Sequence, residues 1–265
     1  MGHHALQRMT GYLKVSVPDL AVAEIERATL QVVVPDELIG LPGWLVPVFA
    51  GTVGRARSAV PLQHAPPELA VIDQVADHYR TRGFQPSFRL PDLPVFGPMQ
   101  AALRARGFAP RQPTLTLTGS VNTLLALHPG PPADIDSAAD AAWTGMFLGP
   151  GLDPEDGASR LLALARGLET QFFSLREGGQ TLACGAAGLA LGWLSVHGMR
   201  TALAHRGQGL AQRVLLAMAG EAHRRGIDRV FLQVDASNAP ALALYRRAGF
   251  NLAWPYAYWQ PIKPD

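Results

Sequence analysis

The segment HRGQGLA at residues 205–211 constrains the fold most, because it stands between a predicted strand, Trp193–Thr201, and a predicted helix, Gln208–Arg225. That helix carries apolar residues at helical spacing. The first N–H groups of a helix have no partners within it and lie at its positive end. Glycine at 207 and 209 would let a ligand approach them. The pattern predicts a phosphate-binding turn, although two glycines that only relax a strand-to-helix turn would look the same.

A second segment, NAPALALYRRAGF at residues 238–250, follows the next predicted strand, Arg229–Val234. Asn238 is a candidate helix N-cap, Pro240 suits the first turn, and Gly249 ends the helix. Capping alone accounts for each of these residues. It does not account for their joint appearance behind the glycine-rich turn.

Together the two segments resemble the GNAT superfamily of acetyl-CoA-dependent N-acetyltransferases. That family's signature R/Q-x-x-G-x-G/A is met by Arg206, Gly209 and Ala211. Its second signature, N-x-x-A-x-x-L-Y-x-x-x-G-F, is met in full by Asn238, Ala241, Leu244, Tyr245, Gly249 and Phe250. Many members also carry a valine and a proline before the arginine, where this chain has Thr201 and Leu203.

The resemblance implies that acetyl-CoA is the acyl donor and that a neutral amine attacks its thioester directly. The pantetheine arm would pair with the strand at Met199, Arg200 and Thr201, and Asn238, Ala241 and Tyr245 would lie toward the thioester. The pyrophosphate would bind the amides of Arg206, Gly207, Gln208, Gly209, Leu210 and Ala211.

Catalytic roles follow from the same resemblance. Tyr245 would be the acid that protonates the departing thiolate, the alternative being a packing residue on a buried helix face. The family's usual glutamate base falls at Ser195, which is a poor base. His197 faces the same side of its strand, and its imidazole, titrating near pH ~6.5, could accept the amine proton. A hydrogen-bonded core histidine is the alternative for His197. A water relay would also serve as the base, and Glu169 and Glu177 are remote candidates that no spacing supports.

The segment PGPPA at residues 129–133 interrupts the chain and predicts a domain boundary between residues 1–128 and 129–265. In the second half, two helices, Asp134–Leu148 and Glu155–Leu168, precede the order β-β-β-α-β-α-β. This is an α/β (α+β) fold, a mixed central sheet with flanking helices.

The first half, in which Arg55–Val60 reads as a strand, looks like a degenerate acetyltransferase-like domain in tandem. It lacks a glycine-rich turn between strand and helix, so it should hold no second CoA. Its segment RARSAVP at 55–61 is similar to a turn in some actinobacterial GNAT proteins. Arg55, Arg57 and Ser58 are candidates for a wall of the acceptor site.

Composition narrows the partners. The net charge is +2 with no basic stripe, which argues against nucleic acid. The one cysteine, Cys184, excludes an internal disulfide and a thiolate metal site, and reads as a buried core residue; no metal is expected. No apolar run reaches ~18 residues and the N-terminus lacks a signal-peptide core, so we expect a cytoplasmic protein without a membrane span.

The expected partner is a small-molecule or peptide amine, and the expected state is a monomer or homodimer. Two other functions stay open. One is a sensor that binds acyl-CoA without turnover, supported by the missing carboxylate at Ser195. The other is an assembly protein whose first half is an interaction surface.

Overall fold

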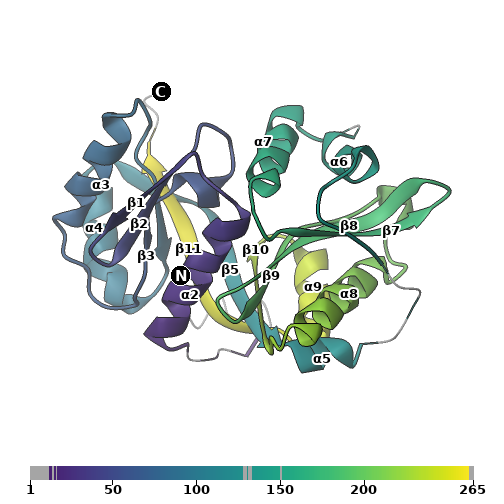
Figure 1. Ribbon diagram of the computed structural model, residues 1–265. Coiled ribbons are helices and arrows are strands. Elements are labelled where there is room, and N and C mark those ends of the chain that lie inside the picture. The colour runs from purple at the N-terminus through teal and green to yellow at the C-terminus, as the bar shows by residue number, and fades with distance from the viewer. Residues whose placement is uncertain are drawn as a thin grey trace.

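The computed structural model describes residues 12, 13, 15, 17–127, 130, 133–149 and 151–262. Its main body is a mixed eight-stranded sheet in the order β4-β11-β5-β10-β9-β8-β7-β6 (Figure 1). Of its neighbouring pairs only β9 and β10 run parallel. The strands are β4 (Phe88–Pro91), β5 (Phe108–Ser120), β6 (Asp134–Asp136), β7 (Gln171–Glu177), β8 (Gln180–Ala190), β9 (Trp193–Thr201), β10 (Arg229–Asp235) and β11 (Asn251–Pro261). The predicted mixed sheet with flanking helices is confirmed.

Helices cover both faces of this sheet. Side chains of α5 (Val121–Leu125), α8 (Leu210–Arg224) and α9 (Ala239–Arg247) form one core with β5, β9 and β10. On the other face, α6 (Ala141–Leu148) and α7 (Pro154–Ala165) pack on β7 and β8, and α2 (Asp19–Val32) packs on β9, β10 and β11. Helix α2 therefore lies over the middle of the sheet, between the two ends of the molecule (Figure 1).

The first half repeats the order of the second. Strands β1 (Glu37–Leu41), β2 (Trp44–Val48) and β3 (Val60–Pro61) precede α3 (Val71–Arg80), β4, α4 (Gly97–Ala105) and β5. The second half runs β7, β8, β9, α8, β10, α9, β11 in the same way. A parallel bridge between Ala59 and Phe88 corresponds to the parallel pair β9 and β10. The first half thus has the predicted acetyltransferase-like order.

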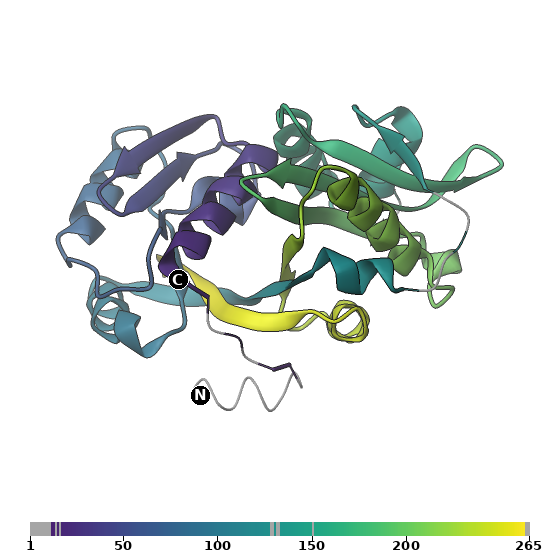
Figure 2. The same ribbon diagram turned by 60° about the horizontal axis from the view of Figure 1, so that its bottom comes forward.

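The last strands of the two halves lie together at the centre. Strand β5 pairs with β10 on one side and β11 on the other, so Leu117 faces both Leu232 and Leu252. Figure 2 shows β5 and β11 running side by side under both halves. The predicted boundary between residues 128 and 129 falls outside the described residues. A cut there would strip β5 from the sheet and expose two unpaired strand edges.

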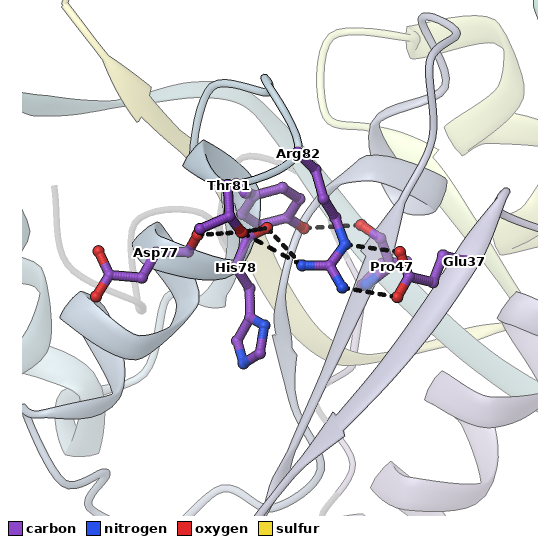
Figure 3. A network of polar contacts seen from close by, with 7 residues as sticks. Glu37, Pro47, Asp77, His78, Thr81 and Arg82 are labelled. Atoms are coloured by element: carbon purple, nitrogen blue, oxygen red, sulfur yellow. Dashed lines mark hydrogen bonds and ion pairs between the residues drawn. The ribbon is translucent and has the colours of Figure 1, made fainter.

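A polar network fixes the first hairpin on its helix. Beyond the end of α3, Arg82 donates from Nε and Nη2 to the two carboxylate oxygens of Glu37 on β1, at 2.7 and 2.8 Å (Figure 3). The buried Tyr79 hydroxyl donates to the Pro47 carbonyl of β2 at 2.8 Å. These bonds orient the β1–β2 hairpin against α3.

Two sequence predictions of local structure are wrong. The segment predicted as a helix over Asp134–Leu148 begins as strand β6, because Arg176 of β7 pairs with Asp134, Asp136 and Asp140 at 3.7, 3.3 and 2.9 Å. Helix α6 begins only after Asp140, whose side chain accepts from the Trp143 amide.

The predicted strand Arg55–Val60 begins instead as the 3₁₀ helix η1 (Gly54–Arg57). Its turn is closed by the Ser58 hydroxyl, which donates to the Gly54 carbonyl at 2.6 Å. Only Val60–Pro61 remains as strand β3. In a strand, successive side chains of this segment would alternate between two faces. In the 3₁₀ helix they point in successive directions around the helix axis instead.

Candidate functional site

Strands β9 and β10 separate at a fork. Their parallel pairing ends at Leu232 opposite Val196, one residue before His197 on β9 and Gln233 on β10. On its other side β9 has a bulge, since Ala186 faces His197 while Cys184 faces Arg200. Gly198, in the bulge, has φ +58°, a conformation that favours glycine. The bulge bends β9 where the two strands part.

Gly198 is a position at the fork that the sequence reasoning missed. A Cβ there would lie 3.2 Å from Phe147 Cζ and 3.4 Å from Leu164 Cδ1, so α6 and α7 lie tightly against the bulge. Its only signal in the sequence is a glycine inside a strand pattern, which is typical of bulges.

The glycine-rich turn lies between β9 and α8, at the open end of the fork. Gly207 and Gly209 have φ +77° and +74°, and no heavy atom lies within 4 Å of the Cβ that either would carry. Among the described residues, none of the N–H groups of residues 207–211 donates to a backbone carbonyl. These amides lie at the N-terminus of a 15-residue helix, which is a site suited to a phosphate group.

The predicted cofactor residues differ in what their side chains contribute. Arg206 and Gln208 are exposed beside the turn, Ala211 is half-buried and Leu210 is buried in the core. The guanidinium of Arg200 instead stacks on Phe147, 4.4 Å from the ring centroid, so only its backbone faces the fork.

Two further predicted cofactor residues lie on β9 toward the turn. Met199 lies against Gly185 with its sulfur, and Thr201 pairs with Ala183 of β8. Only the edge of β9 that faces away from β8 stays open, because β10 pairs no farther than Val196. A backbone-pairing role for Met199, Arg200 and Thr201 therefore remains compatible with the geometry and stays a prediction.

The second motif forms α9 as predicted. The exposed Asn238 caps this helix, accepting from the Ala241 amide at 3.2 Å. Tyr245 is 6% exposed and packs edge-on against Phe250, with ring centroids 5.6 Å apart. Burial, and secondly the hydroxyl of Tyr12, raises the pKa of Tyr245, so its phenol stays protonated at neutral pH.

His197 and Tyr245 lie on opposite faces of the sheet. Val196 packs in the same core as Tyr245, and adjacent strand residues point to opposite faces, so His197 points toward α2 and η1. Ser195 shares that face, and its hydroxyl is engaged by the Gly188 carbonyl at 3.3 Å. The two predicted catalytic groups thus lie on opposite faces of the sheet.

His197 is not a hydrogen-bonded core histidine within the described part of the chain. It is 4% exposed, and neither ring nitrogen has a hydrogen-bond partner there. Burial, and secondly the cation of Arg55, lowers the pKa of His197 well below the usual 6.5. This corrects the expectation that His197 titrates near pH ~6.5, because burial lowers the pKa of His197 and keeps its imidazole neutral at that pH.

Of the three wall candidates in the first half, one reaches the second half. Arg55 donates from Nη1 to Oε1 of Gln233 at 3.2 Å. Arg57 donates to the Gly51 carbonyl at 3.2 Å, and Ser58 is fully buried in its own turn. Helix η1 therefore carries one cation to the fork.

Other features lie away from this site. A pocket of about 550 Å³ lies at the opposite ends of β9 and β10, beside Trp193 and Arg229, and holds none of the predicted site residues. Cys184 is buried, and burial raises the pKa of its thiol to about 12. Within the described ranges, no three His, Cys, Asp or Glu side chains gather in a way that could hold a metal ion. Nor does any helix there have the length and apolarity needed to cross a membrane.

Comparison with known proteins decides the family. Residues 22–259 match the family described as probable histone acetyltransferase Rv0428c, C-terminal. The chain belongs to this family, and it is a GNAT-type N-acetyltransferase. The Rv0428c match spans both halves, which share the β5–β11 centre of the sheet.

Curated relatives match shorter stretches of the chain. The chain is 36% identical over 107 residues to the uncharacterized N-acetyltransferase YsnE of Bacillus subtilis, covering 39% of this chain and 71% of that protein. It is 32% identical over 125 residues to the mycothiol acetyltransferase of Corynebacterium aurimucosum, covering 40% of each. The chain thus spans less than half the length of the latter protein.

Solved structures share the whole fold. A GCN5-related N-acetyltransferase from Kribbella flavida superposes with a TM-score of 0.66 at 18% identity, over 92% of this chain and 96% of that one. A tandem GNAT protein from the clavulanic acid biosynthesis pathway gives 0.57 at 12% identity, over 96% and 99%. The tandem GNAT fold predicted from the sequence is confirmed.

Proposed function

We propose that the chain transfers the acetyl group of acetyl-CoA to a primary amine of a small molecule or peptide, at the fork between β9 and β10. The observation that carries this proposal is the run of free amides at residues 207–211 at the N-terminus of α8. A cofactor with a pyrophosphate suits these donors, and the open space at Gly207 and Gly209 lets it approach.

The residues present fit such a ligand. Arg206 is exposed beside the turn and adds a permanent cation, with its Nε 3.4 Å from the Thr201 carbonyl. The β9 edge from Met199 to Thr201 offers backbone groups for an extended chain, as an added strand would use them. Acetyl-CoA supplies the thioester whose carbonyl the amine attacks.

The residues that flank the fork could move the two protons of this reaction. The neutral imidazole of His197 can accept the proton of the attacking amine, although its low pKa makes it a weak base that must pass the proton on. The phenol of Tyr245, kept protonated by burial, can donate to the departing sulfur from the other face. This assigns one group to each face of the sheet.

The test is a transfer assay with the full chain, acetyl-CoA and a panel of primary amines. Release of CoA should match the acetylated amine measured by mass spectrometry, one for one. A variant with Tyr245→Phe serves as the matched control and should slow release without loss of acetyl-CoA binding. Failure of every amine, with acetyl-CoA firmly bound, would contradict transfer and favour the acyl-CoA sensor.

The sensor has one observation in its favour, which is the serine at the position of the family's usual carboxylate base. The hydroxyl of Ser195 is buried and occupied by Gly188, so it offers no base. His197 lies one strand period farther on and supplies a proton acceptor on the same face, which is why the enzyme is the better account.

A further inference from the structure

We propose that the amine acceptor carries an anionic group, a carboxylate in the first place, and that Arg55 of the first half binds it. This inference rests on the proposed transferase function, because it concerns the acceptor of that same fork. It gives the degenerate half a direct part in choosing the substrate.

Arg55 lies at the end of the fork between β9 and β10. Its Nη1 donates to Gln233, the first residue of β10 beyond the last pair with β9. His197 is the corresponding first residue of β9 beyond that pair. Both strand residues point to the face covered by η1 and α2, since their predecessors Val196 and Leu232 lie in the core of the other face.

The guanidinium of Arg55 keeps most of its donors free within the described residues. It makes one hydrogen bond, to the neutral amide oxygen of Gln233, and no ion pair with a carboxylate. A guanidinium has five N–H donors in a fixed fork that matches a carboxylate or phosphate. The remaining donors are suited to an anion that the chain itself does not provide.

The nearby carboxylate, Glu26, is paired with Arg89 and interacts with Arg55 only secondarily. Glu26 of α2 lies 2.6 Å from Nη2 of Arg89, and both side chains are buried, at 3% and 1% exposure. The charges of Glu26 and Arg89 cancel each other, so the positive charge of Arg55 remains as an excess charge near the fork. The same excess charge helps to keep the neighbouring His197 neutral.

Buried polar atoms around Arg55 lack partners in the described structure. They include Nε2 of Gln233, both ring nitrogens of His197 and Oγ1 of Thr116. Thr116 is the β5 residue that faces Gln233, so these groups follow one line across β9, β10 and β5. Buried polar groups of a native protein are almost always hydrogen-bonded, so this line is suited to a polar ligand.

The arrangement sets the orientation of the acceptor. Its anion would lie on Arg55 and Gln233, and its amine would reach His197 across the fork. An amine without the anion would leave the guanidinium desolvated and unpaired, which costs binding.

The experiment compares matched amines with the full chain at saturating acetyl-CoA. Each of the first two pairs consists of an amino acid and the amine that lacks its carboxylate. These pairs are tyrosine with tyramine, and histidine with histamine. A third pair, O-phosphoethanolamine with ethanolamine, separates a phosphate from a carboxylate. The variants are Arg55→Gln, Arg55→Lys and, as a control for loss of a surface cation, Arg80→Gln, whose side chain lies on the exposed end of α3.

We expect the wild-type chain to prefer the carboxylate members by about 10- to 100-fold in kcat/KM, as for loss of a charged hydrogen bond. Arg55→Gln should remove that preference through KM, with acetyl-CoA affinity unchanged in calorimetry. Arg55→Lys should keep part of it and Arg80→Gln all of it. A preference for O-phosphoethanolamine alone would show that the anionic group of the acceptor is a phosphate and not a carboxylate.

Two results would overturn the inference. Transfer that is indifferent to the anion, or a preference that survives Arg55→Gln, would refute the role of Arg55 and leave the transferase standing. Absence of both acetyl-CoA binding and transfer for every amine would refute the proposed function, and the inference with it.

Discussion

Nη2 of Arg89 on β4 lies 2.6 Å from the carboxylate of Glu26 on α2, and both side chains are almost completely buried. The same guanidinium lies 5.4 Å from the ring centroid of Tyr256 on β11. This ion pair therefore lies under α2 at the point where a strand of the first half meets the last strand of the second. It joins the two halves close to Arg55 and the fork between β9 and β10.

The pair predicts a large stability loss when one partner is neutralised. Glu26→Gln leaves a buried cation without its counter-charge, which should cost about 3–5 kcal/mol of unfolding free energy. Asp77→Asn breaks the exposed pair with Arg80 and should cost about 1 kcal/mol or less. Urea denaturation measures both, and similar small losses would show that the buried charge is compensated otherwise.

The glycine turn predicts the response of acetyl-CoA binding to substitution. Gly209→Glu adds a carboxylate to the space in front of the α8 amides and should abolish measurable affinity. Gly209→Gln has nearly the same size and the same backbone cost at φ +74°, so it separates charge from strain. Calorimetry should find weaker binding in the Gln variant and none in the Glu variant. Unchanged affinity in both would remove the pyrophosphate from this turn.

Tyr245 predicts a loss in kcat without loss of binding. Tyr245→Phe keeps the ring that packs on Phe250 and removes only the hydroxyl. If this phenol protonates the sulfur, kcat should fall by about 10²–10⁴ with acetyl-CoA affinity little changed. Because burial raises the pKa of Tyr245, no loss of activity from its ionisation should occur at pH 7–9. A fall of less than about threefold, with chemistry rate-limiting, would exclude the acid role.

His197 predicts the pH dependence of catalysis. Its pKa lies well below 6.5, so kcat/KM should already be level at neutral pH, with any rise on the acid side. Arg55→Gln removes a nearby cation, so it should raise the pKa of His197 and move that rise to higher pH. His197→Gln should abolish this rise of kcat/KM with pH. A rise that stays in place in the His197 variant would assign the base to water or another residue.

The same residue predicts the sign of stability against pH. The unfolded chain binds the His197 proton more tightly than the folded chain does, because the folded pKa is depressed. The contribution of His197 to the free energy of unfolding is therefore complete above about pH 6.5, and it is lost as the pH falls toward the folded pKa. His197→Gln should flatten this part of the curve in thermal denaturation, and a curve as steep as the wild type would show that other groups cause it.

Sequence reasoning worked best where the physical signal is local. The limits of α8, β9 and α9 follow from an amphipathic stripe, glycine stops and a proline at the first turn, and the structure confirms them within about two residues. The turn at Gly207 and Gly209 formed as predicted, at the positive end of a helix. These elements depend on residues within one or two turns of the chain.

Non-local features were beyond the sequence. The first residues of the predicted helix Asp134–Leu148 form a strand instead, because three of its aspartates pair with Arg176 of β7. That arginine is 36 or more residues away in the chain. Strand β1 was missed because its Leu38 and neighbours are largely exposed and its pairing comes from β2. The pairing of β5 with β10 joins residues more than 100 positions apart, and no local periodicity reports it.

For the site, the motifs indicated the cofactor residues but not the environment of the catalytic ones. The bulge at Gly198 and the contact of Arg55 with Gln233 both arise from packing between separate elements. Burial, and secondly the cation of Arg55, lowers the pKa of His197, which the sequence placed near the usual value. The roles of Tyr245, His197 and the cofactor residues remain predictions.

The most direct test of the account is a calorimetric titration of the full chain with acetyl-CoA. The turn at residues 207–211 offers one set of free helix amides, whereas the corresponding segment of the first half, before α3, carries prolines at 66 and 67 and no glycine. The account predicts one acetyl-CoA bound per chain, lost in Gly209→Glu. Two per chain would contradict the degenerate first half, and none would contradict the transferase itself.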